Sequence, residues 1–359
     1  MTPGTYPGGA VHFRGKAVTL SSRDPADPAV VEATIVQASF QFLAGETPEA
    51  GLDGLTVTAW PGLTIDGASP TIRRCRFVAN SPYAIRCLDG APLIERCLFL
   101  DNLGQYAPAI RCHGGAAVIR NNMVAGNIAE AEPSASYCGQ ASGAGILQNA
   151  VVDNSAADTG FGGAAILCIS GGPLIAGNIL IGNGDEAAAI AAFDAEPRVV
   201  RNALGTLDLD DFDRAALAAD GNLEGDPGLV ESSPGVWVIQ DAASPCVDAG
   251  VHLAGGLFGL ADLAGNSRIQ NGRIDIGACE WTPTPPTPIT LVVTHDGTGD
   301  YTTIQAAIDA AAGAGEIIVV RPGLYNEAID FRGKAVTVTG TDPADPAVVA
   351  ATVLRISGS

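Results

Sequence analysis

Charged and aromatic side chains are scarce in this chain. Of its 359 residues, only 16% are charged and 5% are aromatic, whereas glycine occurs 45 times and proline 23 times. So few charges cannot supply the polar outer faces of many long helices, and the glycines and prolines favour short strands joined by tight turns. Because 47% of the residues are hydrophobic, the chain can still bury a large core.

Basic residues are also few. The chain has 19 Lys and Arg against 39 Asp and Glu, for a formal net charge of -20, and its only lysines are Lys16 and Lys334. An acidic surface repels phosphate backbones, so we expect no nucleic-acid partner. The same charge disfavours polyanionic sugars unless a cation bridges them.

Long apolar runs are absent as well. No run approaches the roughly 20 residues of a membrane-spanning helix, so no membrane-spanning segment is predicted. The segment from Met1 to Tyr6 has neither the basic region nor the apolar stretch of a secretory signal. We therefore expect any export signal to lie outside this sequence.

What the chain does contain is a short internal repeat. In each copy an aliphatic residue is followed by Cys or Asn three positions later, and by an aliphatic residue or Phe two positions after that. The six copies start at Ile72, Ile94, Ile119, Ile146, Ile175 and Val199. A repeat this short buries its apolar face only by stacking on its neighbours. With short alternating strands punctuated by Gly, Asn and Pro, it predicts an all-β fold, a right-handed parallel β-helix.

A second recurring position carries asparagine. The first five copies have Asn80, Asn102, Asn127, Asn154 and Asn183 there, whereas the sixth has Leu207. Asparagine tolerates the left-handed backbone of a sharp turn, and its amide can donate to one neighbour and accept from another. Because buried polar groups need partners, we interpret this column as an internal asparagine ladder and not as a ligand-binding stripe.

The eight cysteines fall into two groups. Six occupy repeat positions, and we interpret them as core thiols, since parallel side chains on one face do not point at each other. Cys246 and Cys279 flank a separate segment, and for an exported protein we predict a disulfide between them. No CxxC or HxxH pair is present, so no metal site is predicted from the cysteines or histidines.

The end of the chain repeats its beginning. FRGKAVT occurs at Phe13 and again at Phe331, and DPADPAVV occurs at Asp24 and again at Asp342, so the two pairs of strings share one offset. A proline-rich run, TPTPPTP, precedes the second copy and reads as a stiff linker. We therefore divide the chain into coils at 1–205, a module at 206–281 that closes the solenoid, a linker at 282–288, and a cap with the first coils of a following copy at 289–359.

The segment after the linker predicts a strand, a short helix and a buried strand. Such a unit covers the open edge of a solenoid. Its cap residues are Ile304, Ile308, Ile317 and Val319. One hypothesis is that this cap docks on the first coil of another copy and builds a head-to-tail filament, and the alternative is a fragment of a longer tandem array.

These residues resemble a known group. SPTIRRCRFVANSPYAIRC looks like the coils of bacterial right-handed β-helix proteins of the pectate-lyase-like superfamily, and DGTGDYTTIQAAID looks like the capping entry of that superfamily. DPGLVESSPGVWVIQDAASPCVDAG is similar to a choice-of-anchor module of large exported proteins. The resemblance implies a β-helix fold and an extracellular or cell-surface location.

The same resemblance implies signatures that the superfamily's enzymes carry, and this chain does not match them. The Arg-Pro-Trp string of pectin methylesterases and the Gly-His-Gly of polygalacturonases are missing. Lyases bind Ca²⁺ through Asp on stacked strands and use an Arg or Lys base. Arg86 and Arg111 share one column here, but no acidic column faces them.

Three sets of residues remain as candidate sites. Asp208, Asp210, Asp211 and Asp213 form the densest acidic cluster, for which Ca²⁺ is weighed against a solvated helix start. Trp60, Tyr83, Tyr106 and Tyr137 lie in or near coil turns, where they could stack on sugar rings or merely cover a coil edge. Arg268 among Asp248, Asp262, Asp275 and Glu280 reads as an internal brace more readily than as a recognition site.

The sequence thus favours a non-catalytic, exported structural or adhesive solenoid that binds polysaccharide or cell-surface glycan and associates with itself. No cofactor is predicted beyond the Ca²⁺ considered above. The alternative is a carbohydrate-active enzyme, a polysaccharide lyase or a glycoside hydrolase, and it requires clustered carboxylates on adjacent coils.

Overall fold

The computed structural model describes residues 1–355 except 131–133, 140–142, 157–163, 184–187, 206–217, 254–256, 271, 283–289, 312–313 and 333. It divides into two compact units, Met1–Trp281 and Thr282–Ser359. The second unit begins at Thr282, the first residue of the predicted linker.

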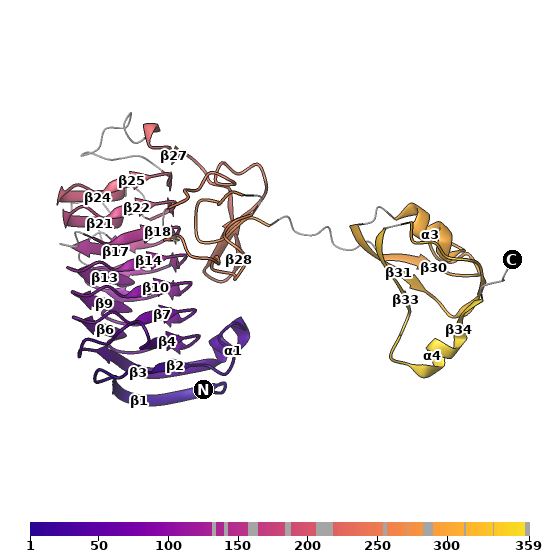
Figure 1. Ribbon diagram of the computed structural model, residues 1–359, viewed down its shortest axis with the longest axis horizontal. Helices are drawn as coiled ribbons and strands as arrows, with labels where there is room; N and C mark the ends of the chain where they lie inside the picture. The colour runs from indigo at the N-terminus through magenta and orange to yellow at the C-terminus, as the bar shows by residue number, and fades with distance from the viewer. Residues whose placement is uncertain are drawn as a thin grey trace. The chain divides into compact units, whose positions relative to one another are not determined.

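The first unit is a parallel β-helix whose coils stack one on another (Figure 1). Its first face consists of β6 (Leu63–Asp66), β9 (Ile85–Leu88), β13 (Ile110–His113), β17 (Ser134–Gly139), β21 (Ala164–Gly171) and β24 (Ala188–Ala195). Its second face consists of β2 (Thr19–Ser21), β4 (Gly51–Asp53), β7 (Thr71–Arg73), β10 (Leu93–Glu95), β14 (Val118–Arg120), β18 (Gly145–Leu147), β22 (Leu174–Ala176) and β25 (Arg198–Val200). The all-β, parallel β-helix prediction is confirmed.

The third face follows the second along the chain in each coil. It consists of β5 (Thr56–Val57), β8 (Arg76–Val78), β11 (Leu98–Leu100), β15 (Met123–Ala125), β19 (Ala150–Val152), β23 (Ile179–Ile181), β26 (Ala203–Leu204) and β27 (Leu223–Glu224). The long strands β1 (Gly4–His12) and β3 (Thr34–Phe42) pair with each other, and β3 pairs with both β5 and β6, so it joins the first and third faces. A helix, α1 (Pro28–Ala33), precedes β3, and a small sheet contains β12 (Leu103–Gly104), β16 (Ile128–Ala129) and β20 (Ser155–Ala156).

The aliphatic residues of the repeat form one interior file. The register along the second face aligns Ile72, Ile94, Ile119, Ile146, Ile175 and Val199. All six are buried in one hydrophobic core. Each short strand is therefore stable only because the next coil covers its apolar side chains.

The asparagine ladder is present in this core. Asn80 donates from its backbone N–H and its side-chain amide to Oδ1 of Asn102, both at 2.9 Å. The same pair of bonds joins Asn102 to Asn127, Asn127 to Asn154, and Asn154 to Asn183. Each amide also donates to a strand carbonyl, as from Asn127 to the Phe99 oxygen at 2.9 Å. The interpretation as an internal ladder is confirmed.

The ladder asparagines do not have the left-handed backbone that the sequence suggested. The left-handed backbone belongs to the residue before each ladder asparagine and not to the asparagine itself. These preceding residues are Ala79, Asp101, Gly126, Asp153 and Gly182, with φ between 52° and 67°. The asparagine is selected by its amide: that of Asn127 bonds the Asn102 backbone N–H, the Phe99 carbonyl and the amides of both neighbouring ladder asparagines.

A second ladder runs parallel to the first and was not predicted. Asn122, Asn149, Asn178, Asn202 and Asn222 are joined by the same paired bonds from backbone N–H and amide to Oδ1. In the earlier coils Cys75 and Cys97 take this position as buried free thiols, and the backbone N–H of Cys97 donates to Asn122. Leu207, which was expected to break the first ladder, lies outside the described residues.

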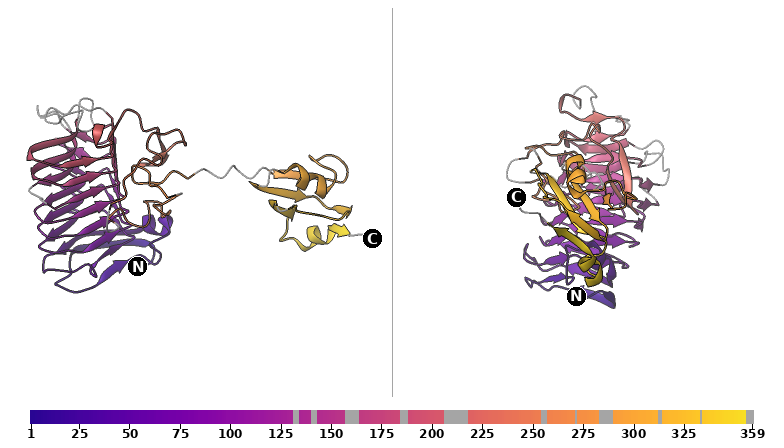
Figure 2. Two further views of the ribbon diagram at one scale, coloured as in Figure 1. Left: turned by 45° about the horizontal axis from the view of Figure 1, so that its top comes forward. Right: turned by 90° about the vertical axis from the view of Figure 1, so that its right-hand side faces the viewer.

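The part of the module that follows β27, residues 225–281, lies against the side of the coils. The hairpin β28 (Leu229–Ser233) and β29 (Val236–Ile239) belongs to this module. Its buried Ile239, Ile276 and Ala278 share a second core with Met123 and Val152 of the third face, and Figure 2 shows this module beside the stack. The module thus begins as the last rung of the stack, where Leu223 and Glu224 pair with β26, and continues along the flank.

The second unit contains β30 (Thr290–Val293), α3 (Ile304–Ala310), β31 (Ala314–Val320), β32 (Gly323–Asn326), β33 (Ala335–Gly340), α4 (Pro346–Ala351) and β34 (Thr352–Arg355). Its last elements copy the start of the first unit. Asp27 caps α1 and Asp345 caps α4, in both cases through the backbone N–H two residues on. β1 pairs Gly4 with Thr34, and β32 pairs Gly323 with Thr352. The repeated sequence therefore folds in the same way twice.

The ladder yields a direct test. Asn127→Ala removes the acceptor of two Asn102 donors and leaves the Phe99 carbonyl without this donor. An unsatisfied buried polar group costs about 1–3 kcal/mol, so we expect the free energy of unfolding to fall by about 3 kcal/mol or more in urea titrations. The exposed Glu130→Ala should change it by less than about 0.5 kcal/mol. Equal effects of the two variants would show that the ladder contributes little.

Candidate functional site

The first face carries aromatic and arginine side chains on adjacent coils. Trp60, Tyr83 and Tyr106 precede β6, β9 and β13, and the strand register aligns Arg86 with Arg111. We call these five residues the aromatic strip. They come close because the turns before successive strands of one face stack, although the residues lie far apart in sequence.

The aromatic rings of the strip differ in exposure. Trp60 is 79% exposed and Tyr106 is 39% exposed, whereas Tyr83 is half-buried and its hydroxyl lies 3.1 Å from Oγ1 of Thr64. Tyr137 lies within β17, in register with Arg111, and not in a turn, and nothing is described of its side chain. An indole with this much free surface can stack on the apolar face of a sugar ring.

The arginines of the strip provide positive charge on an acidic protein. The guanidinium carbon of Arg111 lies 5.4 Å from the ring centre of Tyr106, and its Nε donates to Nε2 of His113 at 3.1 Å. Burial lowers the pKa of His113, and the charges of Arg111 and Arg86 lower it further. The neutral imidazole therefore accepts this hydrogen bond and holds Arg111 over the ring.

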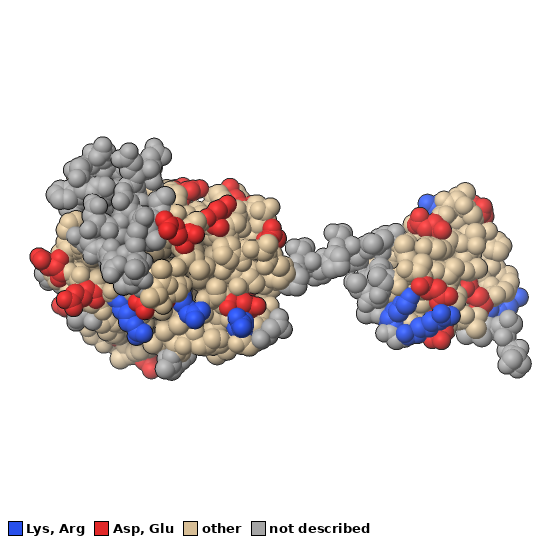
Figure 3. Space-filling view, turned by 90° about the horizontal axis from the view of Figure 1, so that it is seen from above, with Lys and Arg blue, Asp and Glu red and all other residues tan. Residues whose placement is uncertain are grey.

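Carboxylates are sparse along the strip. Asp66 ends β6, and the register places Leu88 and then His113 at this position in the following coils. Within the described part of the chain, no group of three or more His, Cys, Asp and Glu could hold a metal ion. Figure 3 shows acidic and a few basic side chains scattered over one face. The described strip thus consists of aromatic rings and guanidinium groups, with Asp66 at its edge.

Arg268 forms the brace that the sequence suggested. It is fully buried, donates to the carbonyls of Gly277 and Asp275, and lies 3.1 Å from Oε1 of Glu280. Asp262 accepts from the backbone N–H of Glu280 and from Asn266. These groups fix the loops of the flanking module and face no solvent.

The predicted disulfide is absent. Cys246 and Cys279 are both free, buried thiols in the second core. Burial raises the pKa of each to about 12, while Ser244 contacts Cys246 and the backbone of Ala264 contacts Cys279. Each thiol thus has its own neighbours and packs as a small apolar group. The other predicted local site, Ca²⁺ at Asp208, Asp210, Asp211 and Asp213, lies outside the described residues.

The cap residues lie on both sides of the second unit's sheet. Ile304 and Ile308 of α3 are buried in the unit's own core, while Ile317 and Val319 are half-buried on the alternate positions of β31. Lys334 donates to the carbonyls of Ile308, Asp309 and Ala311 at the end of α3. Ile304 and Ile308 therefore hold the helix on its own sheet and are not available to a partner.

Together these features define the class: a parallel β-helix with a buried polar spine, a flanking module and an exposed aromatic strip. No family model matches the chain. A stretch of 50 residues is 44% identical to a probable pectinesterase/pectinesterase inhibitor 17 from Arabidopsis thaliana, covering 14% of this chain and 10% of that protein. None of the described helices is long and apolar enough to cross a membrane.

Solved structures of a PL6 family alginate lyase, AlyGC, are also similar. One has a TM-score of 0.21 and 10% identity over 99% of this chain and 65% of the lyase, and an arginine variant of that lyase has a TM-score of 0.18 and 11% identity over 95% and 64%. The chain thus spans a tenth of the pectinesterase and just under two thirds of the lyase. The fold is defined by the strand register itself, and these likenesses assign no activity to the chain.

The brace predicts a pH dependence. Burial raises the pKa of Glu280 from 4.5 to about 8, although Arg268 opposes this shift. Between these two pH values Glu280 keeps its proton in the folded chain but has lost it in the unfolded chain. The contribution of Glu280 to the free energy of unfolding is therefore fully present below about pH 4.5 and is lost as the pH rises through about 8. We expect urea midpoints to fall between pH 5 and pH 9 and to fall less in Glu280→Gln. Identical pH profiles of the two proteins would contradict this assignment.

Proposed function

We propose that this protein is an extracellular or cell-surface structural solenoid that binds polysaccharide along the aromatic strip without cleaving it. The observation that supports this proposal is the exposed indole of Trp60 in the turn before β6, with Tyr83 and Tyr106 in the turns before the next two strands and with Arg86 and Arg111 in register. Each coil of a parallel β-helix adds about 4.8 Å, so a row of rings along the stack suits an extended glycan chain.

The non-catalytic part of the proposal is supported by the composition of the strip. General acid and base catalysis of glycoside cleavage needs two carboxyl groups near one bond, and none of the five residues of the strip carries a carboxyl group. The alternative, a polysaccharide lyase or hydrolase, is favoured by Arg86 and Arg111, because a lyase requires a basic group beside an acidic sugar. Release of unsaturated products from alginate or pectate, followed by ultraviolet absorbance, would replace our proposal by this alternative.

Self-association is the second part of the proposal. On β31 of the second unit, Ile318 and Val320 lie in that unit's core, whereas the alternate Ile317 and Val319 are only half-buried. Ile317 and Val319 thus form an open apolar surface on the second unit. We infer that the open surface of the second unit stacks on the first coil of another copy, giving a head-to-tail contact.

Binding to the strip is tested by affinity electrophoresis in gels that contain polysaccharide. We expect Trp60→Ala and Tyr106→Ala each to reduce retardation by about tenfold in apparent affinity, which corresponds to about 1.4 kcal/mol per lost ring contact. Phe193→Ala removes a 42% exposed ring elsewhere on the first face and should have no effect. The proposal fails if wild type is not retarded by any glycan, or if all three variants behave alike.

Self-association is tested by light scattering at increasing concentration. We expect the mass of the wild-type particle to rise with concentration, and the double variant Ile317→Ser, Val319→Ser to stay monomeric because its open surface has lost apolar area. Leu260→Ser removes an 89% exposed side chain from the flanking module and should associate like wild type. A wild-type chain that stays monomeric throughout would rule out the head-to-tail contact.

A further inference from the structure

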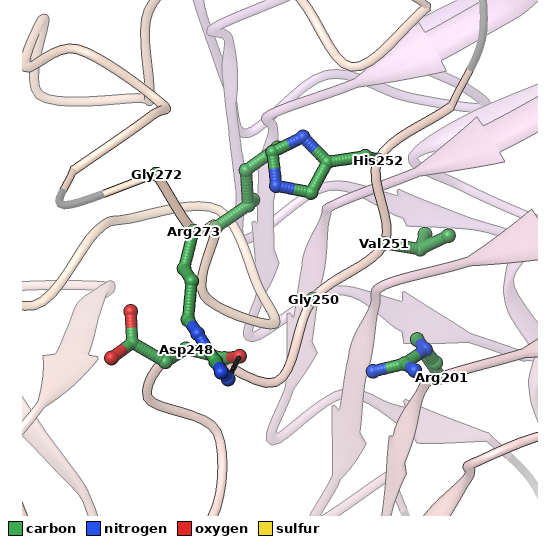
Figure 4. A pocket seen from close by; sticks show the side chains of 8 residues that line it. Arg201, Asp248, Gly250, Val251, His252, Gly272 and Arg273 are labelled. Atoms are coloured by element: carbon green, nitrogen blue, oxygen red, sulfur yellow. Dashed lines mark hydrogen bonds between the residues drawn. The ribbon is translucent and has the colours of Figure 1, made fainter.

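A hollow of about 390 Å³ lies where the flanking module meets the late coils. Arg201 follows β25 and lines it from the coil side, while Asp248, Gly250, His252 and Arg273 line it from the module. In Figure 4 the side chains of Arg201 and Arg273 reach the segment at Asp248 and Gly250, and the ring of His252 stands at the other end. The hollow is separate from the aromatic strip.

The two guanidinium groups in this hollow have no acidic partner among the described residues. Nη1 of Arg201 donates to the Ala249 carbonyl at 3.2 Å, and Nη1 of Arg273 donates to the Asp248 carbonyl at 3.5 Å. Neither belongs to any of the ion pairs found in the described part of the chain. An arginine has five N–H donors, so most of the donors of both groups remain available to an anion.

The backbone that shapes the hollow is fixed. The N–H of Asp248 donates to Oδ1 of Asp275 at 2.7 Å, and that of Gly250 donates to the Ile274 carbonyl at 2.7 Å. A Cβ on Gly250 would lie 2.6 Å from the Asp275 carbonyl, so only glycine fits this close approach. The ring of His252 packs edge-on against Phe258 at 5.9 Å. The site is therefore formed before any ligand arrives, which lowers the cost of binding.

We propose that this hollow binds the carboxylate of a uronic acid residue in a polysaccharide, an inference that rests on the proposed glycan-binding function. Arg201 and Arg273 clamp the carboxylate, since guanidinium and carboxylate match in geometry and charge. The carboxylate of Asp248 and the imidazole of His252 meet the hydroxyl groups of the ring. Two arginines without acidic partners among the described residues, in one concave site, overcome the repulsion that the net charge of -20 exerts on an acidic sugar.

The test is isothermal titration of the intact chain with trigalacturonate. We expect saturable binding, and we expect Arg273→Ala to weaken it at least tenfold. Arg201→Gln should act in the same direction while keeping a long polar side chain at this left-handed position, where φ is 50°. The matched control is Arg198→Ala, an exposed arginine of the same coil that does not line the hollow, and it should bind like wild type. Circular dichroism confirms that each variant is folded.

Three results would overturn the inference: no binding of trigalacturonate, unchanged affinity of Arg273→Ala, or equal binding of the neutral maltotriose. Sulfate that competes as strongly as the sugar acid at equal concentration would likewise overturn it, because the hollow would then select charge alone. Trp60→Ala separates this site from the strip. If polymer binding at the strip is absent while the trimer still binds and depends on Arg273, the proposed function fails and the hollow stands.

Discussion

Every coil of this protein depends on the hydrogen bonds and apolar contacts that it makes with the coil before it and the coil after it. A strand of three residues has no core of its own, so its side chains are buried only by stacking. Two columns of asparagine run inside the stack and satisfy the turn backbones that would otherwise be buried without partners. These asparagine columns fix the register between successive coils. The residues on the outer surface are therefore aligned in the same register.

The sequence predicts the parts that are set by this stacking. The spacing of the repeat predicts that Ile72 and Ile94 lie at equivalent positions and face the core. The strand register confirms that the two residues are aligned, because spacing alone decides which side chains face inward. Spacing could not show that Asn122 and Asn149 belong to a second ladder, since cysteine holds that position in the earlier coils. The left-handed residues escaped prediction as well, because Arg, Gly, Ala, Asp and Gln all occur there.

Contacts between distant segments were harder to foresee. The brace at Arg268 was predicted because its partners are close in sequence. The absent disulfide between Cys246 and Cys279, and the flank position of the module, depend on how loops pack against the third face, which no periodicity encodes. The hollow between Arg201 and Arg273 was missed for the same reason. The hollow combines Arg201 of a coil with Arg273 of the module, which are far apart in sequence and share no repeat. The aromatic residues of the strip, in contrast, recur once per coil and could be recognised from the sequence.

The paired segments that begin at Phe13 and Phe331 fold in the same way, with the same helix cap and nearly the same strand register. Genetic exchange between two such copies would add or remove one whole unit without disturbing any coil, since each coil touches only its neighbours. Where a chain carries several such units, its length can therefore change in a single recombination event while the buried contacts within each unit stay intact.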